Sequence, residues 1–244
     1  MKKILLLMAI LSPFVLISCG DDKDEPVADN HESVDLGLPS GTLWATCNVG
    51  ANAPEEYGDY FAWGETTPKE AYTWENYKWC AWSRDTSGDI PTVSITWYKY
   101  FFKNWTGDAY VTGDNKAELE PEDDAAYVNW GRRWRMPTLE QLQELVDECT
   151  WKWSQKNGVN GCLVTGPNGN SIFLPASGGF SEKLYYDGQC GYLWSRTLCS
   201  REKLALEAAG QDDGYILFYD DGEIGEWYDY RSDGLSVRAV IASR

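Results

Sequence analysis

Apolar residues with a helical period mark one clear helix in the middle of the chain. Within Leu139–Glu148, apolar side chains such as Leu142 and Val146 fall on one helix face. Thr138 precedes this segment and Gln141 follows three residues later, which is the pattern of a capping box. The sequence therefore predicts a helix from about Leu139 to Glu148.

A second, shorter helix is expected over Glu122–Asn129. Asp123 and Asp124 favour the N-terminus of such a helix, because carboxylates interact well with the helix dipole there. Before it, Thr66–Asp124 is rich in aromatic residues, Gly, Asp and Thr without a sustained period. This segment predicts long loops or an insertion.

Elsewhere the apolar pattern approaches a period of two, which is typical of β-strands. Turn signals rich in Gly, Asn and Asp separate pairs of such segments and indicate β-hairpins. Helices in the first half and strands in the second predict the α+β class. The segments expected to be extended are Thr42–Cys47, Tyr57–Trp63, Gly161–Thr165 with Ser171–Leu174, Tyr215–Tyr219 with Ile224–Tyr228, and the closing strand Leu235–Ile241.

The first 18 residues have the pattern of a cleaved signal peptide. Lys2 and Lys3 provide a positive start, an apolar run follows, and small Ser18 precedes Cys19. A membrane-spanning helix is the alternative, but it needs about 20 apolar residues, and Pro13 interrupts a run that is already shorter. The segment that ends at Cys19 resembles a bacterial lipobox, which implies lipidation of Cys19 and a mature chain that begins there.

Three regions follow from this pattern: a signal peptide (1–18), a tether (19–33) and a single domain (34–244). The residues after Cys19 are too polar and too charged to pack, so the tether is expected to be solvated. The acidic stretch resembles the export signal of surface-exposed lipoproteins of the Bacteroidota, which implies an outer-membrane location facing the cell exterior. Eleven of the thirteen tryptophans fall between Trp44 and Trp153, so many are expected in the core of the domain.

The chain is strongly acidic. Its formal charge of −17 moves to −19 when the two positive charges of Lys2 and Lys3 leave with the signal peptide. Nucleic-acid binding draws on Lys and Arg that neutralise phosphates, so this balance excludes a nucleic-acid partner. A surface protein gains solubility from the same charge.

Lipidation of Cys19 leaves six cysteines, an even number that permits disulfides in an exported chain. The sequence does not choose their connectivity, and our first expectation is a bond between Cys47 and Cys149. None of the six lies in a CxxC motif, and the only histidine, His31, belongs to the expected tether. A structural zinc site or a Cys-His nucleophile is therefore not expected.

Acidic residues suggest two kinds of site, but no motif supports either. Asp85–Asp89, Asp212–Asp213 and Asp220–Glu223 could supply oxygen ligands to calcium, although none has EF-hand spacing and Asp-Gly turns are common in hairpins. Solvated turns explain these runs, so no cofactor is expected. A pair of carboxylates could serve a glycosidase, but nothing in the sequence fixes its geometry, and no enzymatic activity is expected.

The segment Tyr185–Tyr230 is rich in Tyr, Trp and Arg, the residue types that dominate binding hot spots. About half of them are expected in the core, because strand side chains alternate between two faces. The residues predicted to contact a ligand are Tyr186, Trp194, Arg196, Tyr219, Trp227, Tyr228, Tyr230 and Arg231.

Five longer motifs are spread along the domain: Val34–Gly41, Trp44–Gly50, Tyr57–Thr66, Trp134–Thr138 and Ser236–Arg238. Together they resemble the Fibrobacter succinogenes major paralogous domain family over nearly all of the segment from residue 34 to residue 241. That family is distantly similar to the formylglycine-generating enzyme group, whose fold is a variant of the C-type lectin-like domain. The resemblance implies two helices, antiparallel strands with long loops, and paired terminal strands. It would place Leu43–Cys47 beside Val237–Ile241.

The resemblance implies neither catalysis nor calcium. Formylglycine-generating enzymes use a close pair of C-terminal cysteines as a copper site, whereas Cys190 and Cys199 have the wrong spacing and are interpreted as structural. Sugar-binding C-type lectins hold calcium with Glu-Pro-Asn or Gln-Pro-Asp, and Glu120–Glu122 is a poor match. In lectin-like folds the C-terminal stretch forms the ligand-facing surface, which diversity-generating retroelements vary in related receptors. This likeness favours a recognition role for Tyr185–Tyr230.

Three functions are consistent with these observations. The first is a non-catalytic recognition module on the outer membrane that binds an extracellular glycan or protein. The second is a structural or fimbria-associated surface component whose aromatic surface meets partner subunits. The third is an unrecognised enzyme that acts on polysaccharide.

Overall fold

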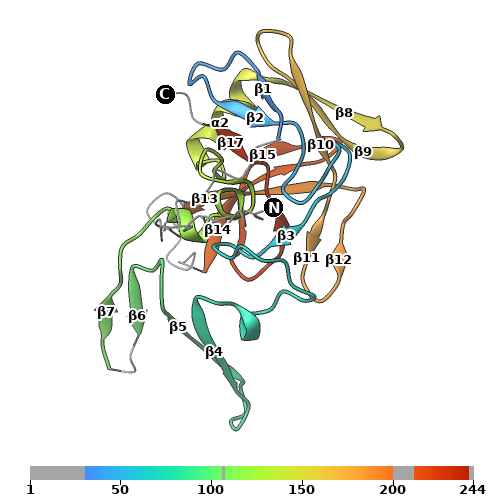
Figure 1. Cartoon of the computed structure of the whole chain (residues 1–244). Helices are drawn as coiled ribbons and strands as arrows, with labels where there is room; N and C mark the ends of the chain where they lie inside the picture. The colour runs from blue at the N-terminus through green and yellow to red at the C-terminus, as the bar shows by residue number, and fades with distance from the viewer. Residues whose placement is uncertain (1–30, 106–107, 200–211, 242–244) are drawn as a thin grey trace, which may run out of the picture.

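The computed structural model describes residues 31–105, 108–199 and 212–241. These residues form mostly antiparallel strands together with two α-helices, which confirms the predicted α+β class (Figure 1). None of the helices in these ranges has the length and hydrophobicity needed to cross a membrane. The predicted signal peptide, the lipidation site Cys19 and most of the predicted tether lie outside the described residues.

A five-stranded sheet brings together strands that are far apart in the sequence. Its order is β15-β14-β13-β16-β3; the β13–β16 pair is parallel and the other pairs are antiparallel. β14 and β15 form the hairpin that the sequence predicts, and β15 extends two residues further than expected. The strands are β3 (Tyr60–Phe61), β13 (Gly191–Leu198), β14 (Asp213–Tyr219), β15 (Ile224–Tyr230) and β16 (Leu235–Ser236).

The two ends of the domain meet in a three-stranded sheet, which confirms the implied pairing of the terminal strands. β2 lies between β1 and β17, with Leu43 opposite Ile241 and Trp44 opposite Val240. The prediction of one continuous closing strand over Leu235–Ile241 is wrong, because its first part pairs within the five-stranded sheet and its last part pairs with β2. The strands are β1 (Ser33–Asp35), β2 (Leu43–Ala45) and β17 (Val240–Ile241).

A second three-stranded sheet, in the order β10-β9-β8, contains the other predicted hairpin. β8 joins it in antiparallel pairing along its whole length, although the sequence did not predict this strand. A short two-stranded sheet, β11 with β12, follows in the chain. The strands are β8 (Thr150–Lys156), β9 (Val159–Thr165), β10 (Ser171–Pro175), β11 (Gly179–Phe180) and β12 (Leu184–Tyr185).

The longer predicted helix is confirmed as α2 (Leu139–Glu148). Its capping box is present: Thr138 accepts the backbone N–H of Gln141, and the Gln141 side chain accepts the backbone N–H of Thr138. Leu142 and Leu145 are fully buried, so the apolar face of the helix packs into the core as its period requires.

The shorter predicted helix is confirmed in part. A 3-10 turn, η2 (Pro121–Asp123), comes first, and α1 (Ala125–Trp130) follows it. Asp124 caps α1, because its side chain accepts a hydrogen bond from the backbone N–H of Tyr127 at 3.1 Å. Acidic residues therefore mark the start of this helix as expected.

For Thr66–Asp124 the sequence predicts long loops or an insertion, and the structure has two hairpins there that project from the body (Figure 1). Each is an isolated two-stranded sheet. Few side chains of these strands face the core, so the sequence lacks the alternation of apolar and polar residues that would predict them. The elements are η1 (Trp74–Asn76), β4 (Cys80–Asp85), β5 (Thr92–Trp97), β6 (Lys103–Trp105) and β7 (Tyr110–Thr112).

Tryptophan dominates the core, as its abundance predicts. Trp63, Trp134 and Trp194 are fully buried in one cluster around the five-stranded sheet. Trp44 is fully buried in a second cluster, which α2 shares with the sheet of β8, β9 and β10. The five-stranded sheet contributes to both clusters and lies between them.

Two fully buried arginines connect segments that are distant in the sequence. Arg238 donates to Asn48 Oδ1 at 2.9 Å, to the carbonyl of Ala45 at 3.0 Å and to the carbonyl of Phe173 at 3.0 Å. Burial lowers the pKa of its guanidinium to about 10, which still leaves it charged at neutral pH. The Ser236–Arg238 motif therefore fastens the C-terminal segment to the segment after β2 and to β10.

The folded region begins earlier than the predicted boundary at residue 34. The His31 ring stacks on Trp130 with ring centroids 3.9 Å apart, and Ser33 pairs with Ala45 in the terminal sheet. The last residues assigned to the tether thus belong to the domain, because aromatic stacking and strand pairing hold them there.

The predicted bond between Cys47 and Cys149 is not formed, and all six described cysteines are free thiols. Cys47 belongs to the first core cluster and donates its thiol to the carbonyl of Ala51 at 3.3 Å. Cys149 packs against the second cluster. Because the two side chains lie in different parts of the core, the structure does not bring them together.

Candidate functional site

A row of aromatic rings crosses the strands of the five-stranded sheet. Tyr192 on β13 lies opposite Phe218 on β14, and their ring centroids are 5.6 Å apart. The Phe218 ring is 6.0 Å from the ring of Trp227 on β15. β14 pairs with β15 in regular register and with β13 in regular register as far as Trp194, so side chains from three strands point to the same face here.

The row continues beyond the sheet to β12. The Tyr185 ring lies 6.3 Å from that of Tyr192 and 5.6 Å from that of Tyr186. Tyr186 has a φ of 56°, which is uncommon for a bulky residue, and its carbonyl accepts backbone N–H groups from Gln189 and Cys190. This turn holds an exposed tyrosine at the end of the aromatic row.

The rings border an open pocket of about 250 Å³. Its apolar lining comes from Tyr192, Ile216, Phe218 and Trp227, and Tyr228 adds to its edge. Its polar lining comes from Glu223 and Asp229, and no Lys, Arg or His is among the described lining residues. The pocket is therefore aromatic on its walls and negative in charge.

Three partly or fully buried carboxyl groups, those of Asp213, Asp229 and Asp233, lie at this end of the sheet. Burial raises the pKa of Asp229. Burial, and then the negative charge of Asp229, raise the pKa of Asp233 to about 7. Burial, and then the charges of Asp212 and Asp229, raise the pKa of Asp213 to about 7. These carboxyl groups disfavour one another's ionisation, so a positive charge nearby would be stabilised.

Four of the eight predicted ligand contacts are exposed. Trp227 is half exposed and lines the pocket together with Tyr228. Tyr230 is 55% exposed at the end of β15, where its ring meets that of Trp74 with centroids 5.8 Å apart. Tyr186 stands at the other end of the aromatic row.

Three predicted contacts are wrong, because the side chains are fully buried. Trp194 donates its indole N–H to the carbonyl of Phe61 at 2.7 Å, inside the first core cluster. Tyr219 lies in the second cluster and donates to the carbonyl of Pro175 at 2.8 Å. Arg231 is enclosed by aromatic rings, 4.5 Å from the Trp97 centroid and 4.8 Å from the Trp63 centroid.

Arg196 is also directed inward. Its side chain is partly buried and pairs with Glu118, with Nε 3.0 Å from Oε2. It donates a further hydrogen bond to the carbonyl of Met136 at 3.3 Å. These contacts place Arg196 in the framework at the other end of β13 rather than in the pocket.

The pocket residues that are not among the predicted ligand contacts are Tyr192, Ile216, Phe218, Glu223 and Asp229. Alternation along β14 places positions 216 and 218 on one face, and the register places Ile216 opposite Trp227. The alternation along the hairpin therefore grouped these residues in the sequence. To identify them as a site, it was also necessary to know which face of the hairpin borders the pocket.

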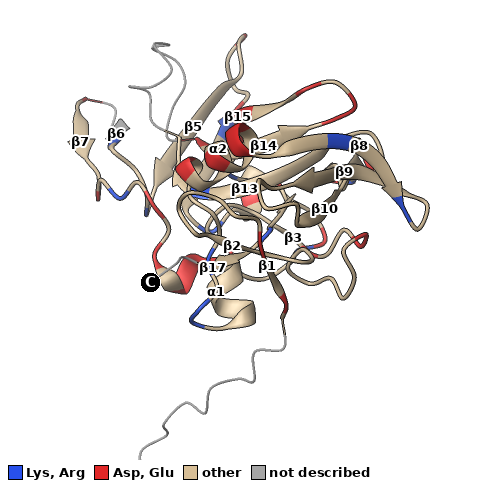
Figure 2. Ribbon diagram, turned by 90° about the horizontal axis from the view of Figure 1, so that it is seen from above, with Lys and Arg blue, Asp and Glu red and all other residues tan. Residues whose placement is uncertain are grey.

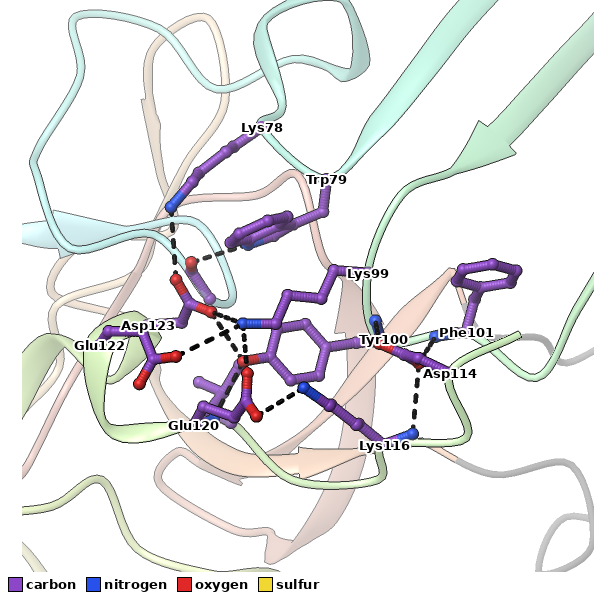
Figure 3. Close-up of polar contacts among 12 residues, drawn as sticks. Lys78, Trp79, Lys99, Tyr100, Phe101, Asp114, Lys116, Glu120, Glu122 and Asp123 are labelled. Atoms are coloured by element: carbon purple, nitrogen blue, oxygen red, sulfur yellow. Dashed lines mark hydrogen bonds and ion pairs between the residues drawn. The ribbon is translucent and has the colours of Figure 1, made fainter.

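A second cluster of acidic residues lies at η2 (Figure 3). Carboxylate oxygens of Glu120, Glu122 and Asp123 lie within 4.8 Å of one another. Lys99 Nζ stands among them, 2.5 Å from Glu120, 2.5 Å from Asp123 and 3.9 Å from Glu122. Asp123 also pairs with Lys78 at 3.3 Å. The lysines supply positive charge to this cluster, which serves to connect the hairpin segment to η2.

Two of the three acidic runs weighed as calcium ligands form local turns. Asp220 Oδ1 accepts the backbone N–H groups of Gly222 and Glu223 at 2.8 and 2.7 Å. Asp85 Oδ1 accepts the backbone N–H of Ser87 at 2.8 Å. Figure 2 shows acidic positions on α2 and several loops, whereas basic positions are few and scattered.

Cys190 and Cys199 are both buried. Burial raises the pKa of both thiols, to about 11 for Cys199, which packs with Leu139 and Tyr215. Neutral, buried thiols agree with the structural interpretation of these two residues.

No protein-family model matches this chain, and comparisons with curated proteins and with solved structures also find no match.

Proposed function

We propose that this protein is a non-catalytic recognition module that binds an extracellular glycan or protein through the aromatic pocket of β13, β14 and β15. The observation that carries the proposal is the exposure of Trp227 beside Phe218 and Tyr192, over a pocket that the side chains of the described residues leave open. Rigid aromatic rings offer large contact area at low entropic cost, which is why they dominate binding hot spots.

We assign the domain to a variant of the C-type lectin-like fold within the major paralogous domain family. Support comes from the five sequence motifs and from the pairing of β2 with β17 at the two ends of the domain. Two helices beside short antiparallel sheets are also compatible with this assignment.

The proposed location is the exterior of the outer membrane, with the protein anchored by acyl chains on Cys19. This step rests on the signal pattern and the acidic stretch that follows it. Labelling with radioactive palmitate in the native host tests it: wild-type chain should take up the label and Cys19→Ser should not. Label retained by Cys19→Ser would contradict the anchor.

A combined glycan and extracellular-protein array, with and without calcium, tests recognition. The full chain purified in detergent should bind a specific ligand class, and Trp227→Ala should abolish retention while near-UV circular dichroism shows a native fold. Tyr98→Ala is the matched control, because Tyr98 is 61% exposed but lies outside the pocket. Equal retention by wild type and Trp227→Ala would argue against this face.

A structural or fimbria-associated role is the second candidate, favoured by the projecting hairpins. Ile90, Val93, Tyr110 and Val111 on or beside them are exposed, and isolated two-stranded sheets offer open edges to a partner strand. A stoichiometric protein partner that co-purifies with wild type, and is lost when Ile90 and Val93 become Ser, would support this role.

A further inference from the structure

The aromatic pocket is small and has the chemistry of a cation site. Small-molecule sites usually have volumes of about 300–1,000 Å³, and this pocket has about 250 Å³. Its walls are the rings of Tyr192, Phe218 and Trp227, whose faces carry partial negative charge. A positive group held against such rings is stabilised by about 0.5–2 kcal/mol.

Two carboxylates complete the negative lining. Neither Glu223 nor Asp229 is paired with a cation in the part of the chain that the structure describes. One oxygen of Asp229 accepts the backbone N–H of Tyr230 at 2.8 Å, which leaves the other available to a ligand. Asp229 is also partly withdrawn from water, so its attraction for a cation is screened less than that of a surface acid.

We propose that this pocket receives a lysine side chain from a basic extracellular protein. This inference rests on the proposed recognition function and names the group that the pocket recognises. The Ile216 and Phe218 side chains contact the methylene stem, the rings surround the ammonium group, and Asp229 and Glu223 neutralise it. The formal charge of −17 on the chain also favours approach of a basic partner.

Lysine fits the pocket better than arginine. A guanidinium ion is held best by a carboxylate that offers both oxygens side by side. At Asp229, one of these oxygens already accepts the backbone N–H of Tyr230, so a side-by-side pair of guanidinium donors would compete with that hydrogen bond. An ammonium ion is a compact point charge that needs only one such oxygen.

The test is a calorimetric titration of the full chain in detergent with Nα-acetyl-lysine methylamide. The neutral probe Nα-acetyl-norleucine methylamide has a similar stem without the ammonium group. We expect the lysine probe to bind at least about tenfold more tightly, because the charge accounts for about 1.4 kcal/mol or more. D-glucosamine, which carries its ammonium on a sugar ring, is the third probe and should bind more weakly than the lysine probe.

Two variants test the assigned contacts. Asp229→Asn should weaken lysine binding about tenfold, whereas Asp221→Asn, the same change of charge at an exposed turn residue outside the lining, should alter it less than about twofold. Trp227→Leu, which keeps the wall apolar but removes the ring, should weaken it about tenfold.

Three results would overturn the inference: equal affinity for the norleucine probe, tighter binding of glucosamine, or no lysine binding by a well-folded chain. If one of these results were obtained and the array still showed a ligand whose binding depends on Trp227, the proposed recognition function would stand. The cation assignment alone would then be wrong.

Discussion

Arg231, enclosed by aromatic rings, and Asp229, at the aromatic pocket, are two residues apart in the sequence. Their charged groups nevertheless lie in opposite environments. Arg231 donates to the Tyr77 hydroxyl at 2.9 Å, to the Tyr100 carbonyl at 2.9 Å and to the Lys99 carbonyl at 3.3 Å, beneath aromatic rings. Asp229 accepts one backbone N–H and otherwise borders a pocket. A buried charge with a full set of partners supports the fold, whereas a partly buried charge beside open space can receive a ligand.

Removal of the Arg231 charge should have the largest effect on stability. Arg231→Met leaves the Tyr77 hydroxyl and two backbone carbonyls without their donor in the core. We expect the free energy of unfolding to fall by about 3–5 kcal/mol. Urea denaturation of the full chain measures it, with Arg196→Met as the control at a partly exposed ion pair, where about 0–1 kcal/mol is expected. Equal losses for the two variants would remove the proposed distinction.

The buried carboxyl group of Asp213, at the start of β14, predicts an effect of pH. The pKa of Asp213 is raised from 3.8 to about 7, so between these values the folded chain binds more protons than the unfolded chain. Stability therefore falls as pH rises through this window, and the cost is fully present above about pH 7. Asp213→Asn should raise the free energy of unfolding by about 1–3 kcal/mol at pH 8 and change it little at pH 4. The same gain at both pH values would show that ionisation is not the cause.

The sequence predicted those elements whose period and caps agree. Thr138 and Gln141 specified the start of α2, and turn residues specified both hairpins. Strands β4 to β7 escaped prediction because their exposed side chains leave no alternation to detect. The split of the closing strand could not be predicted either, since it depends on which sheet each half joins.

The candidate site was predicted at the level of a segment and only in part at the level of residues. Trp194, Tyr219 and Trp227 have similar residue types and similar strand contexts, but the first two are buried and the third is exposed. Their difference depends on which face of each strand meets the core, and that is a property of tertiary packing. Asp229 was missed for the same reason, because its role depends on its neighbours across the sheet.

Trp227→Ala should lower the free energy of unfolding much less than the size of a tryptophan side chain suggests. The side chain is 50% exposed, so its removal leaves no enclosed cavity, and we expect a loss of about 0.5–1 kcal/mol. Trp194→Ala on the neighbouring part of the sheet should cost about 3–5 kcal/mol, because that side chain is fully buried. Thermal unfolding of both variants, followed by circular dichroism, makes the comparison. Similar losses would mean that Trp227 belongs to the framework rather than to a binding surface.

The tip of the β4–β5 hairpin should have the smallest effect. Asp85 pairs with Thr92 at its end, so residues 86–91 can be replaced by Asn-Gly, which closes a two-residue hairpin turn. We expect the free energy of unfolding to change by less than about 0.5 kcal/mol, because the tip is exposed.

The base of the same hairpin differs from its tip, since Cys80 and Trp97 are buried in a cluster with Tyr77. Trp97→Ala should therefore destabilise the chain by about 3 kcal/mol or more, also because it removes a ring that contacts Arg231. If the shortened tip cost as much as the altered base, the hairpin would be a cooperative part of the core. If the shortened tip cost little stability but abolished binding of a protein partner, the hairpin would act as an interaction surface separate from the aromatic pocket.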